Sequence, residues 1–173
     1  MFESNAVISV VMPLYNEEAM VADTVSDVLA RAETFELIIV DDFSTDKSYE
    51  IVSKLAEADK RIKLFKNEAN RGKGYSVRKG IEACSGKIIL VQDADREYSP
   101  SDYPMLIDPI LSGKADVVYG SRFLGGQGRV LYFRHELGNR LLTFKSNLLT
   151  DINLTDMETC YKAFRREVIQ NIN

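Results

Sequence analysis

The chain has 173 residues, 45% of them hydrophobic and 28% charged, which is ordinary for one globular domain with a core of its own. Its 26 acidic and 22 basic residues give a formal net charge of −4, which argues against nucleic acid as a partner. No stretch approaches the roughly 18 consecutive apolar residues that a membrane-spanning helix needs.

Short apolar runs alternate with amphipathic segments through the first 120 residues, which is the pattern of βαβ units. Strands are predicted at 7–12, 35–40, 62–66, 87–92 and 117–119, and helices at 18–32, 44–57, 101–112 and, more briefly, after Gly74. We expect Pro104 and Pro109 to interrupt the helix at 101–112. The almost wholly apolar run at 87–92 suits a strand covered on both faces. The sequence therefore predicts an α/β fold around a mostly parallel sheet.

The pattern changes after Gly120. Three glycines at 125, 126 and 128 indicate a loop, and helical spacing returns at about 134–149. The charged residues 165–167 are typical of the first turn of another helix, and because the chain stops soon after them, we expect it to be truncated at its C-terminus. Cys84 and Cys160 are far apart and form no CxxC motif, which favours a reduced, cytoplasmic compartment.

Four polar clusters follow predicted strands directly. They are Tyr15-Asn16-Glu17, Asp41-Asp42, the glycine-containing segment 70–74, and Asp93-Ala94-Asp95. In a parallel α/β sheet, ligands bind outside the carboxyl ends of the strands, where all four clusters would meet. Any one of them could be ordinary turn or capping residues, but four at one edge predict a binding site.

Asp93 and Asp95 are the sharpest signal. Residues i and i+2 of an extended segment point the same way, and Glu97 could add a third oxygen ligand. Ligation by oxygen alone suits Mg²⁺ or Mn²⁺, which would let a diphosphate approach the carboxylates and would stabilise its departure. The alternative is that Asp95 caps a turn and Asp93 is merely exposed.

The other clusters each allow two interpretations. Asp41 and Asp42 could accept hydrogen bonds from a base or ribose, or Asp42 or Ser44 could cap the next helix. In the segment 70–74, Arg71 and Lys73 stand at a helix start, where they could close on an anion, or the segment could be an ordinary strand-to-helix turn.

Basic residues predominate between positions 122 and 145. The five are Arg122, Arg129, Arg134, Arg140 and Lys145, and the single acid is Glu136. This patch could bind an anionic acceptor such as a lipid phosphate, although such runs are more often solvated helix faces. His135, the only histidine, is interpreted as a loop or capping residue. The chain lacks GxGxxG after its first strand, a complete P-loop and GxSxG.

In order and spacing, six segments together resemble the family 2 glycosyltransferases with the GT-A fold. They are VVMPLYNEE (10–18), IIVDDFSTDKS (38–48), NRGKGYSVRKGIEACSG (70–86), VQDADREYSP (91–100), YGSRF (119–123) and TDMETCYKAFRRE (155–167). The resemblance is strongest to synthases of the dolichyl- or polyprenyl-phosphate mannose and glucose type. It implies a three-layer α/β/α sandwich forming one catalytic domain over 1–173, with 1–120 binding the nucleotide-sugar and 121–173 on the acceptor side.

The resemblance also implies roles for individual residues. The nucleotide-sugar would contact Pro13, Tyr15, Glu17, Asp41, Asp42, Lys73 and Asp93, the last of these through the metal that it holds together with Asp95 and Glu97. Arg122 would meet the acceptor phosphate, with Arg134 as a second such arginine. The family inverts the anomeric carbon by direct displacement, and Asp95 and Arg122 would support that step.

The acceptor is where this sequence departs from the synthases. It has MetGluThrCysTyr at 157–161, where the synthases have a Ser-Gly-Phe-like segment, and Gly138 where a hydroxyl is expected. A phosphate acceptor needs no strong base, whereas a sugar hydroxyl would need Asp156 or Glu158 to take its proton. We therefore expect a polyprenyl phosphate acceptor at the cytosolic membrane face. The alternatives are a hydroxyl acceptor in polysaccharide or glycolipid synthesis, or a non-catalytic nucleotide- or metal-binding domain.

Overall fold

A computed structural model describes residues 6–122 and 133–172, with the side chains of 133–136 left out. The strands are β1 (Ile8–Leu14), β2 (Thr34–Asp41), β3 (Ile62–Lys66), β4 (Ile88–Val91), β5 (Val117–Tyr119) and β6 (Lys162–Arg165). The helices are α1 (Val21–Leu29), α2 (Ser48–Ala58), α3 (Lys73–Glu82), α4 (Tyr103–Leu111), α5 (Phe133–Thr150) and α6 (Arg166–Ile169), and the short 3-10 helix η1 (Pro100–Asp102) precedes α4.

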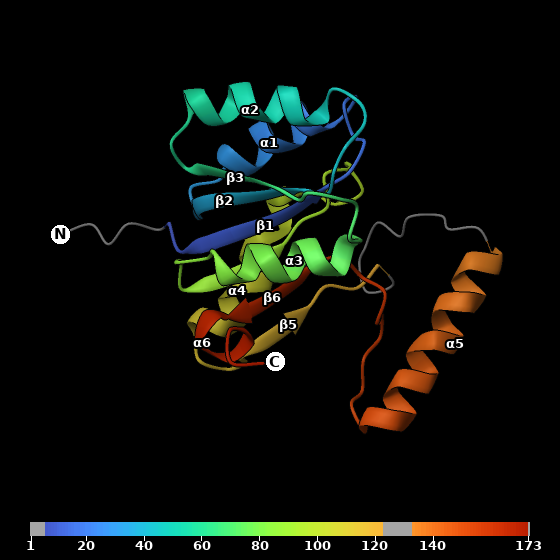
Figure 1. Ribbon diagram of the computed structural model, residues 1–173. Helices are drawn as coiled ribbons and strands as arrows, with labels where there is room; N and C mark the ends of the chain where they lie inside the picture. Colours follow the sequence, from blue (N-terminus) through green and yellow to red (C-terminus); the bar gives the residue numbers. More distant parts are fainter. Residues whose placement is uncertain (1–5, 123–132, 173) are drawn as a thin grey trace.

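The strands form one mixed sheet in the order β3-β2-β1-β4-β6-β5 (Figure 1). β3, β2, β1 and β4 are parallel, whereas β6 runs antiparallel to both β4 and β5. The parallel strands alternate with α1, α2 and α3, so the βαβ prediction is confirmed. The carboxyl ends of β1, β2 and β4 consequently open on the same edge.

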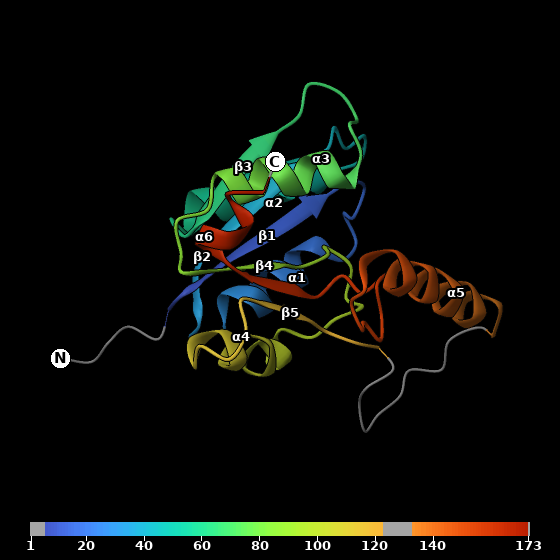
Figure 2. The same ribbon diagram turned by 90° about the horizontal axis from the view of Figure 1, so that it is seen from below.

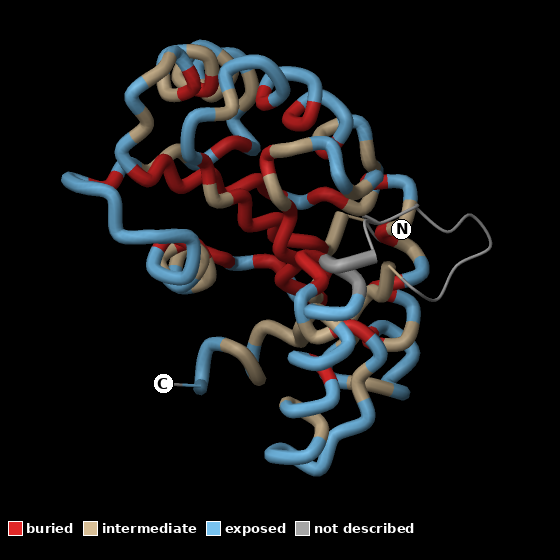
Figure 3. The backbone as a smooth tube through the Cα atoms, turned by 90° about the vertical axis from the view of Figure 1, so that its right-hand side faces the viewer, coloured by how far each residue is buried: buried red, intermediate tan, exposed pale blue. Residues whose placement is uncertain are grey.

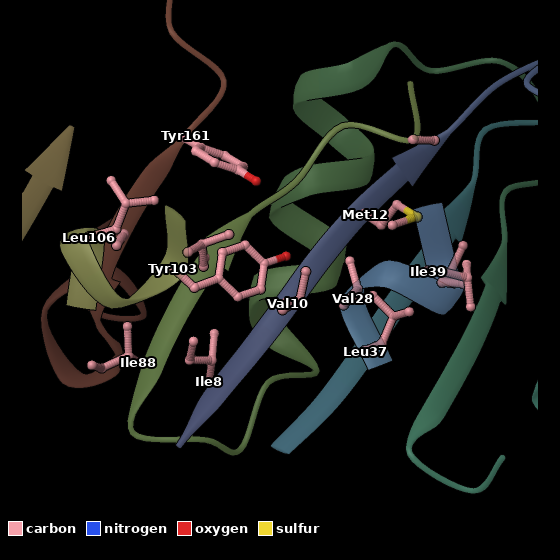
Figure 4. Close-up of a cluster of buried hydrophobic side chains, with 14 of the residues drawn as sticks. Ile8, Val10, Met12, Val28, Leu37, Ile39, Ile88, Tyr103, Leu106 and Tyr161 are labelled. Carbon is pink, nitrogen blue, oxygen red and sulfur yellow. The ribbon is translucent and has the colours of Figure 1, made fainter. Parts of the chain in front are cut away.

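Helices cover both faces of the sheet (Figures 1 and 2). The strands divide their side chains between two clusters, because successive residues point to opposite faces: Val10 and Met12 of β1 face α1 and α4, while Val11 faces α3. Buried residues concentrate along these strands in Figure 3, and Figure 4 shows the larger cluster between the sheet and α1 and α4. This is the predicted three-layer α/β/α arrangement.

Several details of the sequence prediction differ from the structure. The first two helices begin later than expected, since α1 covers Val21–Leu29 rather than 18–32 and α2 covers Ser48–Ala58 rather than 44–57. The helix α4 is continuous, because Pro104 lies at its start, where no backbone N–H is needed, and Pro109 is accommodated inside it. β6 was not predicted at all, whereas the helical turn expected near 165–167 is α6. Among the described residues, no helix is both long and apolar enough to cross a bilayer.

A buried carboxylate ties the strands together at the edge away from the four polar clusters. Glu36, 3% exposed, accepts hydrogen bonds from the hydroxyls of Ser9 (2.6 Å) and Ser85 (2.9 Å) and forms an ion pair of 2.6 Å with Lys63. Burial by itself raises the pKa of Glu36, but Lys63 and the two serines lower it to about 2, against an ordinary value of 4.5. This carboxylate therefore stabilises the fold in its charged form.

We expect Glu36→Gln to lower the free energy of unfolding by about 2 kcal/mol at neutral pH. Because the folded-state pKa is depressed, this contribution is complete above pH 4.5 and is lost as the pH falls toward about 2. Urea unfolding at pH 7 and pH 3 measures the difference, which should shrink at the lower pH. The exposed Glu50→Gln serves as the control, and an equal loss at both pH values would contradict the assignment.

Candidate functional site

A cavity of about 390 Å³ lies at the carboxyl ends of β1, β2 and β4. Its wall contains residues from all four predicted clusters, namely Tyr15, Glu17, Asp42, Lys73, Asp93 and Asp95, together with Pro13. These positions span 83 residues of sequence from the first to the last, and the parallel strands bring them to one edge. The predicted convergence of the clusters is thus observed.

The loop after β1 is fastened to the loop after β2. Asn16 adopts a left-handed backbone with φ 55°, and its side-chain oxygen accepts a hydrogen bond of 2.8 Å from the Thr45 N–H. The backbone N–H of Glu17 donates to the Ser48 hydroxyl at 2.7 Å. Burial, followed by the nearby charges of Asp95, Asp46 and Asp93, raises the pKa of the Glu17 carboxyl. The cavity wall is therefore rigid here and strongly acidic.

Asp42 organises the loop 70–74 and does not cap α2. Its Oδ1 accepts hydrogen bonds from Asn67 Nδ2 (2.8 Å) and Arg71 N (2.9 Å), and its Oδ2 accepts one from Gly72 N (2.7 Å). Burial acts to raise its pKa, but these donors lower it below the ordinary value. Ser44 does not cap α2 either; its hydroxyl accepts from the Asn16 N–H at 3.1 Å. Both capping alternatives are therefore wrong.

Asp41, the neighbouring carboxylate, is fully buried at the end of β2. Its Oδ2 accepts a hydrogen bond of 3.2 Å from the Ser44 N–H. Its Oδ1 has no hydrogen-bond partner among the residues that the structure describes. A buried acceptor without a donor is costly. Asp41 is not among the residues that line the cavity, unlike its neighbour Asp42.

Lys73 carries the positive charge of the cavity at the first position of α3. Its Nζ lies 2.6 Å from Oδ1 and 2.8 Å from Oδ2 of Asp93. Burial acts to lower the pKa of Lys73, but the bond to Asp93 and the nearby negative charges together outweigh it, so that the pKa is raised. The lysine predicted to meet an anion is therefore paired with one of the two predicted metal ligands.

The segment Asp93-Ala94-Asp95 is held from α1. The buried Thr24 hydroxyl donates to the Ala94 carbonyl at 2.9 Å, and Arg96 forms ion pairs with Asp23 and Asp27 at 3.2 and 3.3 Å. Asp95 Oδ1 accepts a hydrogen bond of 3.0 Å from the Glu97 N–H, so Asp95 does cap a turn, as the alternative interpretation expected. Asp95 Oδ2 takes no part in that bond. Sequence patterns gave no signal for Thr24, since a threonine in an amphipathic helix is unremarkable.

Glu97 does not complete a ready-made metal site. It is exposed, and within 6–122 and 137–172 no three His, Cys, Asp or Glu side chains lie close enough together to hold an ion. Asp93 and Asp95 nevertheless line the same cavity and offer only oxygen atoms, the donors that Mg²⁺ and Mn²⁺ prefer. The two aspartates fit such an ion, and a third ligand would come from the substrate, water or a movement of Glu97.

A buried glutamine fixes the end of β4, immediately before Asp93. The hydroxyls of Tyr103 and Tyr161 both donate to Gln92 Oε1, at 3.0 and 2.8 Å, and these two rings lie at the sheet in Figure 4. Gln92 Nε2 donates in turn to the Asp93 carbonyl at 3.1 Å. Gln92 was not among the predicted site residues, although a polar residue at the end of an apolar strand is a detectable signal.

Arg122 and Asp156 form a two-pronged ion pair. Arg122 Nε lies 2.8 Å from Asp156 Oδ2, its second guanidinium nitrogen 2.8 Å from Oδ1, and its backbone N–H donates to Oδ2 at 3.1 Å. The Asp156 side chain is fully buried. Burial acts to raise its pKa, but Arg122 lowers it below the ordinary value. Asp156 is consequently a poor proton acceptor, whereas the other candidate base, Glu158, is exposed.

The pair lies beside the loop 93–98. Tyr98 and Glu97 are near enough to raise the pKa of the Arg122 guanidinium further, after the larger effect of Asp156. The Cys160 N–H donates to the Tyr98 hydroxyl at 3.2 Å, which joins this loop to the segment that carries Asp156. Arg134, the second predicted acceptor arginine, is the second residue of α5, but its side chain is outside the described part. Arg129 also lies outside the described residues.

Comparisons with known proteins match this arrangement. The model of the family described as Glycosyl transferase family 2 matches residues 9–172. A Pyrococcus furiosus dolichol-phosphate mannosyltransferase is 28% identical over 95% of this chain and 48% of its own length. An Aeromonas hydrophila undecaprenyl-phosphate 4-deoxy-4-formamido-L-arabinose transferase is 29% identical over 94% of this chain and 50% of its own. The chain thus spans about half the length of these curated relatives.

Solved structures show the same fold. Glucosyl-3-phosphoglycerate synthase from Mycobacterium tuberculosis, in complex with Mn²⁺, UDP-glucose and phosphoglyceric acid, superposes with a TM-score of 0.72. It is 25% identical and matches 96% of this chain and 59% of its own. The match therefore covers nearly the whole of this chain.

Proposed function

Because this chain belongs to glycosyl transferase family 2 and has the GT-A fold, we propose that it transfers a sugar from a UDP- or GDP-sugar to a polyprenyl phosphate. The observation that carries the proposal is the cavity in which Asp93, Asp95 and Lys73 meet at the carboxyl edge of the sheet. The relatives from P. furiosus and A. hydrophila are named as transferases that use a lipid phosphate, which supports a lipid phosphate as the acceptor. The complex of the synthase with UDP-glucose supports a nucleotide-sugar as the donor.

In the donor half, Asp93 and Asp95 would hold Mg²⁺ or Mn²⁺, with Glu97 as the third candidate ligand. When bound, the ion neutralises the diphosphate and stabilises the negative charge on the departing nucleoside diphosphate. Lys73, which forms an ion pair with Asp93 in this structure, would bind a phosphate oxygen of the donor instead. Without cations, the diphosphate would face Glu17, Asp93 and Asp95 together, which Coulomb repulsion opposes.

The nucleoside half uses the loops after β1 and β2. Tyr15 exposes 47% of its surface and lines the cavity with Pro13, so the ring can pack against a base or ribose. Asp41 is a further proposed acceptor for a base or ribose donor, which would reach its unpartnered Oδ1 once the loop that covers it moves, because Asp41 is fully buried and outside the cavity wall. Asp42 acts indirectly, since its bonds to Arg71 and Gly72 shape the loop that closes the cavity.

At the acceptor half, Arg122 binds the phosphate, with Arg134 as a second arginine. An oxygen of the acceptor phosphate attacks the anomeric carbon as the bond from that carbon to the diphosphate oxygen breaks, which inverts the configuration. A phosphate monoester, with its second pKa near about 6, is mostly ionised at neutral pH and needs no base. Residues 1–120 then serve the donor and 121–173 the acceptor, at the cytosolic face of a membrane.

A hydroxyl acceptor is the second candidate, and it requires a carboxylate that takes a proton. Asp156 is held by Arg122 in its charged form, which leaves Glu158 for that role. The geometry therefore favours the phosphate acceptor. A non-catalytic nucleotide- or metal-binding domain is a third candidate, which the experiment below separates from a transferase.

Thermal unfolding across a panel of UDP- and GDP-sugars, with Mn²⁺ or with EDTA, tests the donor half. A donor at about 100 times its Kd should add about 2.7 kcal/mol, or roughly 5–10 °C, only when Mn²⁺ is present. A response to one nucleotide series identifies the base, and that donor then enters a transfer assay with polyprenyl phosphate. No response to any donor would contradict the proposal.

A further inference from the structure

The helix α5 has an apolar outer stripe, which we define as Leu137, Leu141, Phe144 and Leu148. Their spacing of four, three and four residues places them on one face of the helix. All four are exposed, by 58%, 53%, 63% and 73%. Apolar side chains aligned in this way normally face a core, whereas single exposed ones need no explanation.

The polar face of α5 is the one that faces its own chain. The Thr143 hydroxyl, on a residue only 6% exposed, accepts a hydrogen bond of 3.1 Å from the Met157 N–H. Asn147 donates to the Leu154 carbonyl at 2.8 Å and accepts from the Leu154 N–H at 3.0 Å. These bonds fix the rotation of the helix, so the outer stripe is held outward.

The charges on α5 are mainly positive. The helix carries Arg134, Arg140 and Lys145 against one acid, Glu136, although the chain as a whole has a net charge of −4. If the stripe packed against the stripe of a second copy, the basic residues of the two helices would come close together and repel one another. A membrane with anionic headgroups has an apolar interior beneath a negatively charged surface. It therefore matches both the apolar stripe and the basic residues of α5.

The position of α5 suits such a surface. It lies outside the three-layer body, on the side to which β1 points, in both Figure 1 and Figure 2. That side is the carboxyl edge, where the cavity opens. A lipid surface against α5 would therefore lie on the same side of the molecule as the candidate site.

We propose that the outer stripe of α5 docks on an anionic lipid membrane, its apolar side chains entering the boundary between headgroups and acyl chains and Lys145 meeting lipid phosphates. This inference rests on the lipid-linked acceptor of the proposed function and names the surface that presents the enzyme to it. The mode is that of an interfacial helix, which lies on a membrane without crossing it.

Flotation with vesicles tests the inference. The full chain should float with vesicles of phosphatidylcholine mixed with phosphatidylglycerol, and much less with phosphatidylcholine alone. Leu148→Glu should weaken partitioning about tenfold or more. Met105→Glu is the matched control, since Met105 on α4 is also 73% exposed, and it should float like the parent. Circular dichroism checks that each variant is folded.

Two outcomes would overturn the inference. One is a parent chain that stays with the unbound protein, or a Leu148→Glu variant that floats equally well. The other is self-association in sedimentation that Leu148→Glu abolishes, without flotation of the parent, which would assign the stripe to a second copy. Donor stabilisation is measured separately, so a failure of docking with intact donor binding leaves the transferase proposal standing.

Discussion

Asp95→Asn should remove the Mn²⁺-dependent part of donor stabilisation and lower sugar transfer by at least about 100-fold. The amide keeps the shape of the carboxylate and can still accept from the Glu97 N–H, now 3.0 Å from Asp95 Oδ1. It loses the charge that attracts the ion. Calorimetric titration of Mn²⁺ in the presence of the nucleotide, together with the transfer assay, measures both effects.

The control is Asp108→Asn, an exposed acid on α4 that does not line the cavity, which should leave both readings at the parent level. Glu97→Gln separates the third candidate ligand from the two aspartates: a smaller but distinct loss of metal affinity supports its assignment. Unchanged metal-dependent stabilisation in Asp95→Asn would contradict the metal site itself.

The sequence was sufficient for the architecture because its apolar runs are continuous and local. β1, β2, β3 and β4 are found within two residues of their predicted bounds at either end, and their alternation with helices dictated a parallel sheet. β6 was not predicted because it has only four residues, Lys-Ala-Phe-Arg, with a charged residue at each end. Only one of the four, Ala163, is buried. Its identity as a strand comes from pairing with β4 and β5, which are distant in sequence.

The site was predictable as a location but less so as a set of roles. A cluster after a strand indicates where a side chain will lie, and the cavity contains residues from all four clusters. The partners of those side chains are non-local: Asp42 binds backbone N–H groups 29 and 30 positions away, and Arg122 binds a carboxylate 34 positions away. No local pattern specifies such bonds, so capping and positioning could not be told apart beforehand.

Arg122→Ala should raise the KM for a polyprenyl phosphate by about 100-fold while leaving donor stabilisation at the parent level. In the proposed function the guanidinium meets the acceptor phosphate, and Arg122 is not among the residues that line the donor cavity. Asp156→Asn should act through the same group, since its carboxylate fixes both Nε and the terminal nitrogen of Arg122. Steady-state kinetics with the acceptor varied measures both variants.

The double variant distinguishes positioning from proton transfer. If Asp156 works only through Arg122, then Asp156→Asn combined with Arg122→Ala should lose no more activity than Arg122→Ala alone, because the two changes remove one shared interaction. If Asp156 were a general base, its replacement would lower kcat and add to the effect of Arg122→Ala, and the lowered pKa of Asp156 already opposes that role.

The free energy of unfolding of each variant has to be measured together with its kinetics. The reason is that Asp156→Asn leaves Arg122, whose side chain is only 19% exposed, without its counter-charge. Breaking such a pair costs roughly 3–5 kcal/mol, so the assays belong well below the unfolding midpoint of each variant. Arg122→Lys retains the charge and loses the two-pronged geometry, and it should recover stability more than acceptor affinity. If Arg122→Lys bound the acceptor as tightly as the parent, the acceptor would require only a positive charge. The orientation that Asp156 imposes on Arg122 would then not contribute to acceptor binding.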